Sequence, residues 1–248
     1  MSAVVVIPAR MASTRLPGKP LADIGGMPII VRVWRQAMKA EVGRVVVAAA
    51  EAEIVDAVTK AGGLAVLTHP DLPSGTDRVF AALEAFAGGE DIVVNLQGDL
   101  PALEPAQLRT VCDTLANSNA DIATLVAEIE DPTERENPNV VKAVVAWDAG
   151  SNQGRALYFT RASAPSGDGA LFHHVGIYAF RRAALARFVA LPPSPLERRE
   201  RLEQLRALEA GMHIRVAKID GVPLSVDTPD DLARARTLLA ARQERASS

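Results

Sequence analysis

The sequence predicts an α/β fold, and three observations lead to it. Short runs rich in valine, isoleucine and alanine alternate with longer segments that have the period of a helix. Some of these runs, such as IVVNL at 92–96, are apolar at nearly every position, as strands buried on both faces of a parallel sheet are. The chain has 248 residues, 48% of them hydrophobic, which is enough to bury a large core. We therefore expect a single domain over residues 1–248, with a mostly parallel central sheet.

The first half of the chain shows this alternation most clearly. In the first expected helix, Ile29, Val33 and Ala37 recur at helical spacing, with Pro28 at its start. Strands are expected at 4–7, 44–49, 64–68 and 91–96. Helices are expected at 29–39, 51–61, 77–86 and 105–117.

The pattern loosens between about residues 130 and 195. Two strand candidates, at 140–147 and 172–180, are separated there by a stretch that contains glycine, serine and proline. We expect a mixed α+β insertion that carries substrate contacts. The remaining elements are expected to be a helix at 196–210, a strand at 213–219 and a terminal helix at 229–242.

Composition argues against nucleic acid and membranes as partners. The formal net charge of −3 provides no polybasic field that would attract either of them. The sequence has no apolar run of the roughly 18 residues that cross a bilayer. Its one cysteine, Cys112, cannot form a disulfide within the chain, which fits a reducing compartment. We expect a cytoplasmic protein that acts on small molecules.

The loop after the first expected strand, PARMASTRLPGKP, is rich in positive charge. It places Arg10, Arg15 and Lys19 before the first helix. Ligands of open α/β sheets bind beyond the carboxyl ends of the strands, where backbone amides and basic side chains suit phosphate. A solvated surface loop is the alternative. The loop is not a Walker A motif, because Ser13 stands at the first glycine position and Pro20 follows Lys19.

Two acidic residues also follow extended segments. Gln97 and Asp99 come directly after the strand at 91–96, although Gly-Asp at a strand end is often only a turn. Asp227 precedes Thr228 and Asp231, which have the spacing of a capping box and leave Asp227 outside the cap.

If Asp99 and Asp227 converge, their carboxylates need a cation. Two negative charges about 4 Å apart repel by roughly 4 kcal/mol at an effective dielectric near 20. Carboxylates, phosphate oxygens and waters make an all-oxygen site of the kind that Mg²⁺ prefers. The sequence therefore indicates a magnesium site, and no cysteine and histidine cluster has zinc spacing.

A second group of polar residues lies in the later part of the chain. In HHVGIYAF, alternation puts His174 and Tyr178 on one face of a strand and Val175, Ile177 and Ala179 on the other. Each of the two could instead be an ordinary, partly buried polar residue. In the helix expected at 196–210, the packing stripe is Leu202, Leu205 and Leu208. Glu203 and Gln204 lie off that stripe, and periodicity alone leaves them as solvated residues.

Seven segments together carry a resemblance to a known family. They are IPARMASTRLPGKPL, PSGTDR, NLQGDLP, ALYFTRASAP, HHVGIYAF, PSPLERRERLEQLR and VDTPDDL. The sequence resembles the cytidylyltransferases of 3-deoxy-D-manno-octulosonate (KDO), also called CMP-KDO synthetases, over nearly its whole length.

The resemblance implies a Rossmann-like nucleotidyltransferase fold in which the insertion at about 130–195 serves sugar binding and dimerisation. It implies a magnesium-dependent enzyme that transfers CMP from CTP to the anomeric hydroxyl of KDO. The products would be pyrophosphate and CMP-KDO for lipopolysaccharide biosynthesis, and the enzyme would be a homodimer.

The resemblance also implies roles for individual residues. The CTP-binding residues would be Arg10, Ser13, Arg15, Lys19, Ser74, Arg78 and Gln97. The catalytic residues would be Arg15, Lys19, Gln97, Asp99 and Asp227, with Asp99 and Asp227 as the metal ligands. The sugar-binding residues would be Arg161, His174, Tyr178, Glu203 and Gln204. Arg161 would face the carboxylate of the sugar acid.

The sequence departs from the family pattern at three places. Leu100 stands where the family often has an acidic residue, which excludes a metal contact from that side chain. The connection from Pro165 to Phe172 is shorter than in many members, and the strand reads GIYAF where the family often has GIYGY. An 8-amino KDO or a sialic acid therefore remains an alternative acceptor, although STRLPGKPL argues against the sialic acid branch. A non-catalytic nucleotide-binding module is the alternative of another class, and the presence of both Asp99 and Asp227 argues against it.

Overall fold

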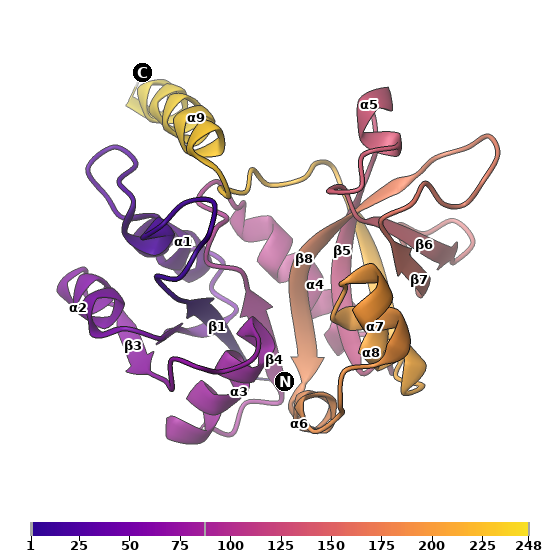
Figure 1. Ribbon diagram of the computed structural model, residues 1–248, viewed down its shortest axis with the longest axis horizontal. Coiled ribbons are helices and arrows are strands. Elements are labelled where there is room, and N and C mark those ends of the chain that lie inside the picture. The colour runs from indigo at the N-terminus through magenta and orange to yellow at the C-terminus, as the bar shows by residue number, and fades with distance from the viewer. Residues whose placement is uncertain (1, 87, 248) are drawn as a thin grey trace. The chain divides into compact units, whose positions relative to one another are not determined.

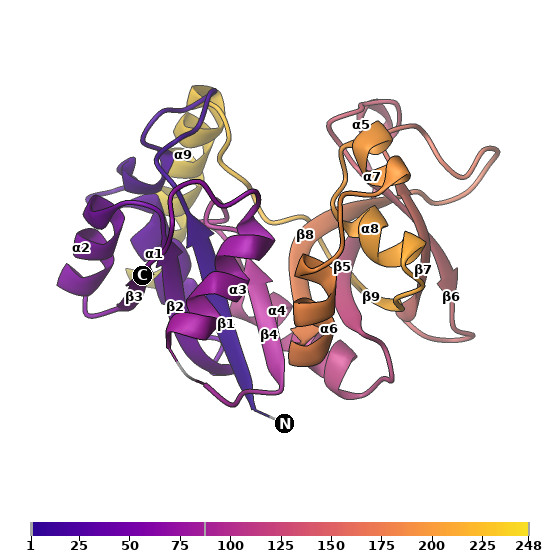
Figure 2. The ribbon, with the colours of Figure 1, turned by 60° about the horizontal axis from the view of Figure 1, so that its bottom comes forward.

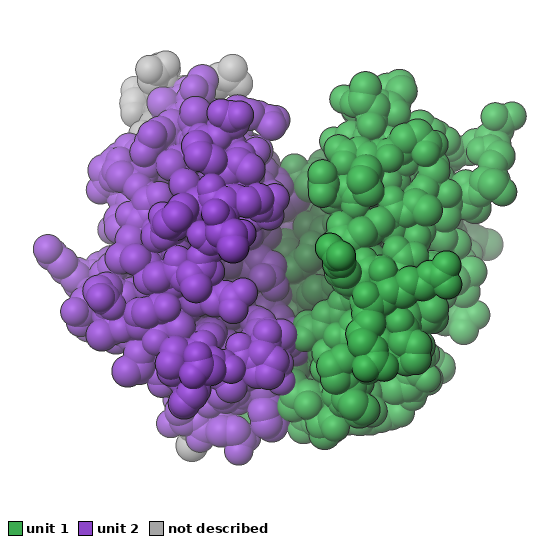
Figure 3. All heavy atoms as spheres, in the orientation of Figure 1, with its two compact units in different colours: residues 1, 91–94, 109–222 green, residues 2–90, 95–108, 223–248 purple. Residues whose placement is uncertain are grey.

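The computed structural model describes residues 2–86 and 88–247, with side chains described as far as Arg242. It divides into two compact units (Figure 3). The terminal unit comprises residues 2–90, 95–108 and 223–248, and the central unit comprises residues 91–94 and 109–222. The segment expected as an insertion, at about 130–195, lies wholly within the central unit, which begins earlier and ends later.

The terminal unit contains parallel strands in the order β3-β2-β1, of which Figure 1 labels β1 and β3 and Figure 2 labels all three. Val5 of β1 lies opposite Val45 of β2, and Val46 of β2 lies opposite Leu64 of β3. β4 is divided between the two units, because its last two residues belong to the terminal unit. The strands are β1 (Ala3–Ala9), β2 (Gly43–Ala49), β3 (Leu64–Leu67) and β4 (Ile92–Leu96).

Helices pack against these strands through apolar faces. α1 (Ile29–Met38) buries Ile29, Val33 and Ala37, the residues whose spacing predicted it. α2 (Ala52–Lys60) contacts β3, and α3 (Gly75–Ala85) contacts β1. The unit also contains the short helix η1 (Lys19–Leu21), the first turn of α4 (Pro105–Ala116) and α9 (Pro229–Ser247).

The central unit has a mixed sheet, so the expected mostly parallel sheet is wrong for this part of the chain. The strand order is β8-β5-β9-β7-β6, and a further pairing of β6 with β8 closes it on itself. Among strands β5 to β9, as far as the structure describes them, β5 and β9 pair in parallel, whereas the pairs β5–β8, β6–β7, β6–β8 and β7–β9 are antiparallel. Short connections such as residues 148–152 favour antiparallel pairs, because a parallel pair needs a long crossover. The strands are β5 (Ile122–Glu128), β6 (Lys142–Trp147), β7 (Gln153–Thr160), β8 (Phe172–Arg181) and β9 (Ile214–Ile219).

Four short helices belong to the central unit, and α7 and α8 lie beside each other (Figure 2). The single helix expected at 196–210 is wrong, because Arg201 adopts a left-handed conformation with φ 57° and separates α7 from α8. The prediction that Leu202, Leu205 and Leu208 form the packing face is also wrong, since Leu208 is only half-buried while Gln204 and Ala207 are buried. The helices are α5 (Pro132–Arg135), α6 (Arg182–Val189), α7 (Pro195–Glu200) and α8 (Gln204–Glu209).

Candidate active site

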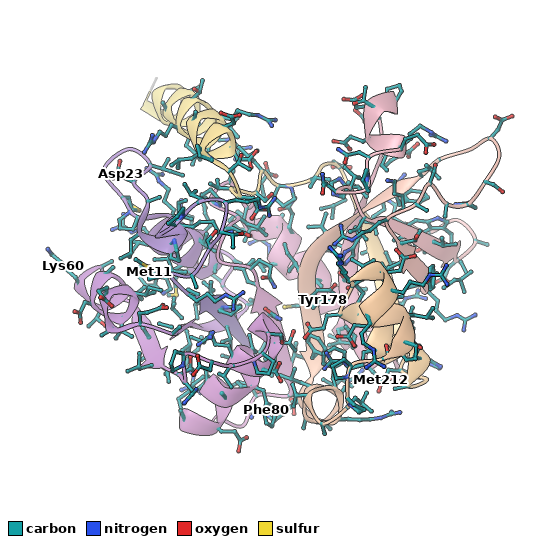
Figure 4. All side chains as sticks on the ribbon, viewed as in Figure 1. Met11, Asp23, Lys60, Phe80, Tyr178 and Met212 are labelled. Atoms are coloured by element: carbon teal, nitrogen blue, oxygen red, sulfur yellow. The ribbon has the colours of Figure 1, made fainter. Side chains whose placement is uncertain are left out.

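The cationic loop follows β1, and backbone contacts fix both of its ends. The Gly18 amide donates to the carbonyl of Met11, a residue marked in Figure 4, over 3.2 Å. The Met11 amide donates to the carboxylate of Glu51 over 2.9 Å. Gly18 has φ 68°, which turns the chain into η1 and places Lys19 at the start of that helix.

A cavity of about 370 Å³ opens beside this loop, within the terminal unit. Its walls come from the loop after β1, from the start of α3 and from the segment after β4. Eight residues that the sequence singled out line it together: Arg10, Ser13, Arg15, Lys19, Ser74, Arg78, Gln97 and Asp99. The carboxyl ends of β1 and β4 thus converge on one cavity, as expected for an α/β sheet.

Asp99 and Asp227 meet at the Lys19 ammonium, which confirms that the two carboxylates converge. Lys19 Nζ lies 2.9 Å from Asp99 Oδ2 and 3.0 Å from Asp227 Oδ1. Arg15 adds a second ion pair to Asp227, at 3.2 Å. The Val226 amide donates to the Asp99 carbonyl over 2.9 Å, which holds the two segments side by side. Two carboxylates therefore share one cation.

The charge of Lys19 is stabilised by this arrangement. Burial acts to lower the pKa of the ammonium, but the attraction of Asp99 and Asp227 outweighs burial and raises the pKa above its ordinary value. Lys19 is accordingly a permanent cation at neutral pH, held between two acids.

Two other lining residues are engaged with the protein itself. Ser74 caps α3, since its hydroxyl oxygen accepts the Asp77 amide over 3.1 Å. Arg78 is 2% exposed and donates to the Thr68 hydroxyl and to the carbonyls of His69 and Pro70. Arg78 thus holds the segment at 68–70 in place beside the cavity.

Gln97 and Gly98 fit closely at the end of β4. The Gln97 side-chain amide donates to Asn95 Oδ1 over 3.3 Å. A Cβ atom at Gly98 would lie 3.0 Å from the carbonyl oxygen of Pro8, so a larger residue would press on the strand next to it.

His174 and Tyr178 share one face of β8, as the alternation predicted. Their ring centroids lie 5.4 Å apart, and Figure 4 marks Tyr178 on that strand. Burial, with a smaller effect of His173, lowers the pKa of His174 to about 3, so its imidazole is neutral. Its Nε2 lies 3.0 Å from the hydroxyl of Thr124. Burial and then the charge of Glu203 raise the pKa of Tyr178 well above 10.

Arg161, Glu203 and Gln204 lie in the central unit too. Gln204 is buried at the start of α8, and Glu203 immediately precedes it. The Arg161 guanidinium donates to three backbone carbonyls, those of Glu200 at 2.8 Å, Pro138 at 3.0 Å and Arg201 at 3.4 Å. The expected carboxylate clamp is therefore occupied by main-chain oxygens in this structure.

The comparisons with known proteins agree with one another. A family model described as cytidylyltransferase matches residues 4–214. The 3-deoxy-manno-octulosonate cytidylyltransferase of Parvibaculum lavamentivorans is 65% identical over 241 residues, covering 96% of this chain and 93% of the relative. The enzyme of the same name from Rhodospirillum rubrum is 61% identical over 239 residues, covering 95% of each chain. The chain belongs to the 3-deoxy-manno-octulosonate cytidylyltransferase family.

A solved structure supports the same family assignment. It is a CMP:2-keto-3-deoxy-manno-octonic acid synthetase complexed with CTP, which is 38% identical and superposes with a TM-score of 0.91. The match covers 98% of this chain and the whole of the other. The nucleotidyltransferase fold that the resemblance implied is thereby confirmed, with a mixed rather than a mostly parallel sheet.

Within the part of the chain that the structure describes, no group of three or more histidine, cysteine, aspartate or glutamate side chains could hold a metal ion. The pair Asp99 and Asp227 would therefore need further oxygen ligands from substrate or water. Among the described helices, none is long and apolar enough to cross a membrane.

Some residues that line the cavity or contact Arg161 are not among those predicted from the sequence. Leu72 and Gly75 line the cavity but were not singled out. Gly75 could have been noticed, because Ser-Gly-Thr at a helix start exposes backbone amides that suit an anion. Glu200 contacts Arg161 and was not singled out either, since nothing in its charged helix distinguishes it from the residues around it.

Proposed function

We propose that the protein transfers CMP from CTP to the anomeric hydroxyl of KDO, giving CMP-KDO and pyrophosphate. The observation that carries this proposal is the cavity after β1, where the expected CTP residues converge and Lys19 joins Asp99 to Asp227. The names of the relatives and the CTP complex of the solved structure support it.

The chemistry is an in-line displacement at phosphorus. The hydroxyl oxygen at C2 of KDO forms a bond to the α-phosphorus of CTP as its proton passes to solvent, and the bond from that phosphorus to the bridging oxygen of the β-phosphate breaks. Pyrophosphate leaves with the electron pair, and no covalent enzyme intermediate is needed. Most of the catalysis is then positioning and electrostatic stabilisation.

The cations of the loop suit the negative charge of the triphosphate. Arg10, Arg15 and Lys19 line the cavity and would bind the phosphates of CTP. Arg15 is largely exposed and pairs with Asp227, whereas Lys19 is largely buried and pairs with both carboxylates. Both would stabilise the charge that develops on the departing pyrophosphate.

Asp99 and Asp227 fit a magnesium ion. Both carboxylates already contact a single cation, the Lys19 ammonium, so their geometry suits a shared positive charge. Bound there, Mg²⁺ would neutralise phosphate charge and polarise the phosphorus centre. The two carboxylates hold the ion in this proposal, and phosphate oxygens and waters complete its ligands.

The central unit supplies the sugar contacts in this proposal. His174, Tyr178 and Glu203 lie near one another, and Gln204 follows directly. Neutral His174 and protonated Tyr178 are hydrogen-bonding groups that suit the hydroxyls of a sugar acid. Arg161 would bind the carboxylate through the two guanidinium N–H groups that its three main-chain hydrogen bonds leave over.

The direct test is a pyrophosphate-release assay with purified protein, CTP, MgCl₂ and KDO, with CMP-KDO identified by mass spectrometry. Release of pyrophosphate that depends on all three additions is expected. Binding of CTP without any KDO-dependent release would instead support a non-catalytic nucleotide-binding module.

A panel of acceptors tests the sugar. We expect kcat/KM to be highest for KDO, lower for 8-amino-KDO and lowest for N-acetylneuraminate, because unpaired polar groups in a buried site reject a wrong ligand strongly. A preference for either of the other two would overturn the choice of acceptor and leave the cytidylyltransferase activity standing.

We also propose that the enzyme is a cytoplasmic homodimer whose product feeds lipopolysaccharide assembly. These points rest on the family resemblance. Light scattering on the purified protein would test the dimer, and a monomeric mass at micromolar concentration would contradict it.

A further inference from the structure

Glu200 and Arg201 form the turn that leads from α7 to α8, and we call this turn the elbow. Neither residue has been assigned a role so far. α7 begins with a capping box between Ser194 and Glu197 and ends at Glu200. Arg201 then turns the chain in a left-handed conformation, with φ 57° and ψ 47°. Glu203 and Gln204, the two expected sugar ligands of this segment, follow within three residues.

The side chain of Glu200 fastens this elbow to the end of β7. Its Oε1 accepts the Thr160 hydroxyl over 2.8 Å, and its Oε2 accepts the Arg161 amide over 2.9 Å. The Tyr158 hydroxyl lies 3.5 Å from Oε1. One carboxylate thus contacts three residues at the carboxyl end of β7.

Arg161 also contacts the elbow, because its guanidinium donates hydrogen bonds to two main-chain carbonyls there. Its Nε donates to the Glu200 carbonyl over 2.8 Å, and its Nη2 donates to the Arg201 carbonyl over 3.4 Å. Charged hydrogen bonds of this kind are stronger than neutral ones and fix geometry. The position of the Arg161 guanidinium is therefore tied to the position of the elbow.

The elbow leads directly to two other expected sugar ligands, Glu203 and Gln204 at the start of α8. Glu203 lies close enough to Tyr178 for its charge to act on the phenol, and Tyr178 contacts His174. Arg206 holds α8 to α7 through an ion pair with Glu197 at 2.5 Å. Arg161 on one side and Glu203, Gln204 and Tyr178 on the other are thus connected through residues 200 and 201.

We propose that Glu200 is a positioning residue for the sugar acid, which sets the placement of Arg161 relative to Glu203 and Gln204 through its contacts with Thr160 and Arg161. This inference rests on the proposed function. Glu200 does not touch the reacting atoms in this proposal. It acts through the residues that do, so its loss affects binding of the acceptor and not of the nucleotide.

The test is steady-state kinetics of Glu200→Ala and Glu200→Gln with CTP and KDO. We expect KM for KDO to rise about tenfold or more in Glu200→Ala, because small displacements of binding groups are costly. KM for CTP should stay within about twofold, since the expected CTP residues belong to the terminal unit and Glu200 belongs to the central unit. KM for KDO should rise less in Glu200→Gln than in Glu200→Ala, because the remaining carbonyl oxygen of the glutamine can still accept a hydrogen bond from the Arg161 amide.

Glu209→Ala is the matched control. Its carboxylate also joins the two helices, by accepting the Leu196 amide over 3.0 Å, but it makes no hydrogen bond to β7. KM for KDO should be near the wild-type value in this variant. An equal rise in both glutamate variants would show that loosening the helix pair, rather than losing the contact with β7, causes the effect.

Thr160→Val keeps the proposal testable if Glu200→Ala fails to fold. It removes the hydroxyl that donates to Glu200 and nearly preserves the shape of the side chain. A raised KM for KDO at an unchanged melting temperature supports the proposal. An unchanged KM for KDO in both Thr160→Val and Glu200→Gln would overturn it. Absence of turnover in the wild-type protein would overturn the proposed function instead.

Discussion

Lys19 touches both carboxylates that are proposed to hold a divalent cation, so its ammonium competes with the metal for the same oxygens. We expect Lys19→Met to bind Mn²⁺ more tightly than the wild-type protein in the absence of nucleotide. A gain of about fivefold corresponds to roughly 1 kcal/mol, a reasonable value for two partly exposed charge pairs. Electron paramagnetic resonance of free Mn²⁺ measures this affinity directly.

The matched control for that experiment is Lys39→Met. It removes the same charge from an exposed site that has no contact with Asp99 or Asp227, so metal affinity should not change. Equal affinities in wild-type protein and Lys19→Met would mean that the ammonium does not occupy the place between the two carboxylates in solution.

Asp99→Asn and Asp227→Asn should each reduce turnover at least about a hundredfold while the protein stays folded. Each change removes one negative ligand from the proposed metal site and one partner of Lys19. Pyrophosphate release at limiting Mg²⁺ measures the loss, and thermal melting checks the fold. A near-wild-type rate in either variant would contradict the two-carboxylate site.

His174 should make the protein less stable in acid. Its pKa in the folded protein is about 3, against an ordinary value of 6.5, so between these values the unfolded chain binds a proton that the folded chain does not. The stability that neutral His174 contributes is present above pH 6.5 and is lost as the pH falls, by up to about 1.4 kcal/mol per pH unit. Urea unfolding at several pH values would show a shallower slope in His174→Gln than in wild-type protein. If His174→Gln has the wild-type slope, the buried imidazole does not account for the loss of stability.

At the scale of elements, the sequence predicted well where apolar residues are buried at regular spacing. β1, α1 and β2 are examples, since nearly all of their inward positions carry valine, isoleucine or alanine. β7 could not be found in this way, because Gly154 and Ala156 are buried while Leu157 is exposed. Hydropathy therefore does not follow burial at Gly154 and Leu157, and the pairing with β6 and β9 defines the strand.

The same contrast separates the two groups of site residues. Residues of the cavity follow β1 and β4, and strand ends are recognisable in a sequence, so their convergence could be predicted. The contacts of Arg161 with the carbonyls at 138, 200 and 201 depend on tertiary structure and leave no local pattern. The turn at Arg201 was hidden as well, because glycine is the usual signal for a left-handed residue.

Arg201→Gly should therefore stabilise the elbow. A non-glycine residue in the left-handed region costs about 1 kcal/mol, which glycine avoids, although glycine gains freedom in the unfolded chain. We expect a melting temperature equal to or slightly above that of the wild-type protein, with KM for KDO unchanged, because the Arg201 carbonyl is retained. Arg201→Val, which tolerates this conformation poorly, should melt at a lower temperature and raise KM for KDO.

At the scale of the whole molecule, the expected CTP residues all lie in the terminal unit and the expected sugar residues all lie in the central unit. The sequence suggested one domain with an insertion at about 130–195, because that is where the periodicity weakens. β5 and β9 belong to the same unit but lie outside those bounds, and their membership depends on pairing between distant segments. Local periodicity carries no information about such pairing.

The exposed leucines of β3 affect how the protein behaves at high concentration. β3 ends the strand order, and among the described strands only β2 pairs with it. Leu64 and Leu67 are 46% and 59% exposed. A short apolar edge of this kind can pair with another copy of itself, which promotes aggregation during storage.

Leu67→Lys should lower the turbidity of concentrated samples on warming and leave kcat/KM unchanged. Turbidity equal to that of the wild-type protein would mean that aggregation begins elsewhere.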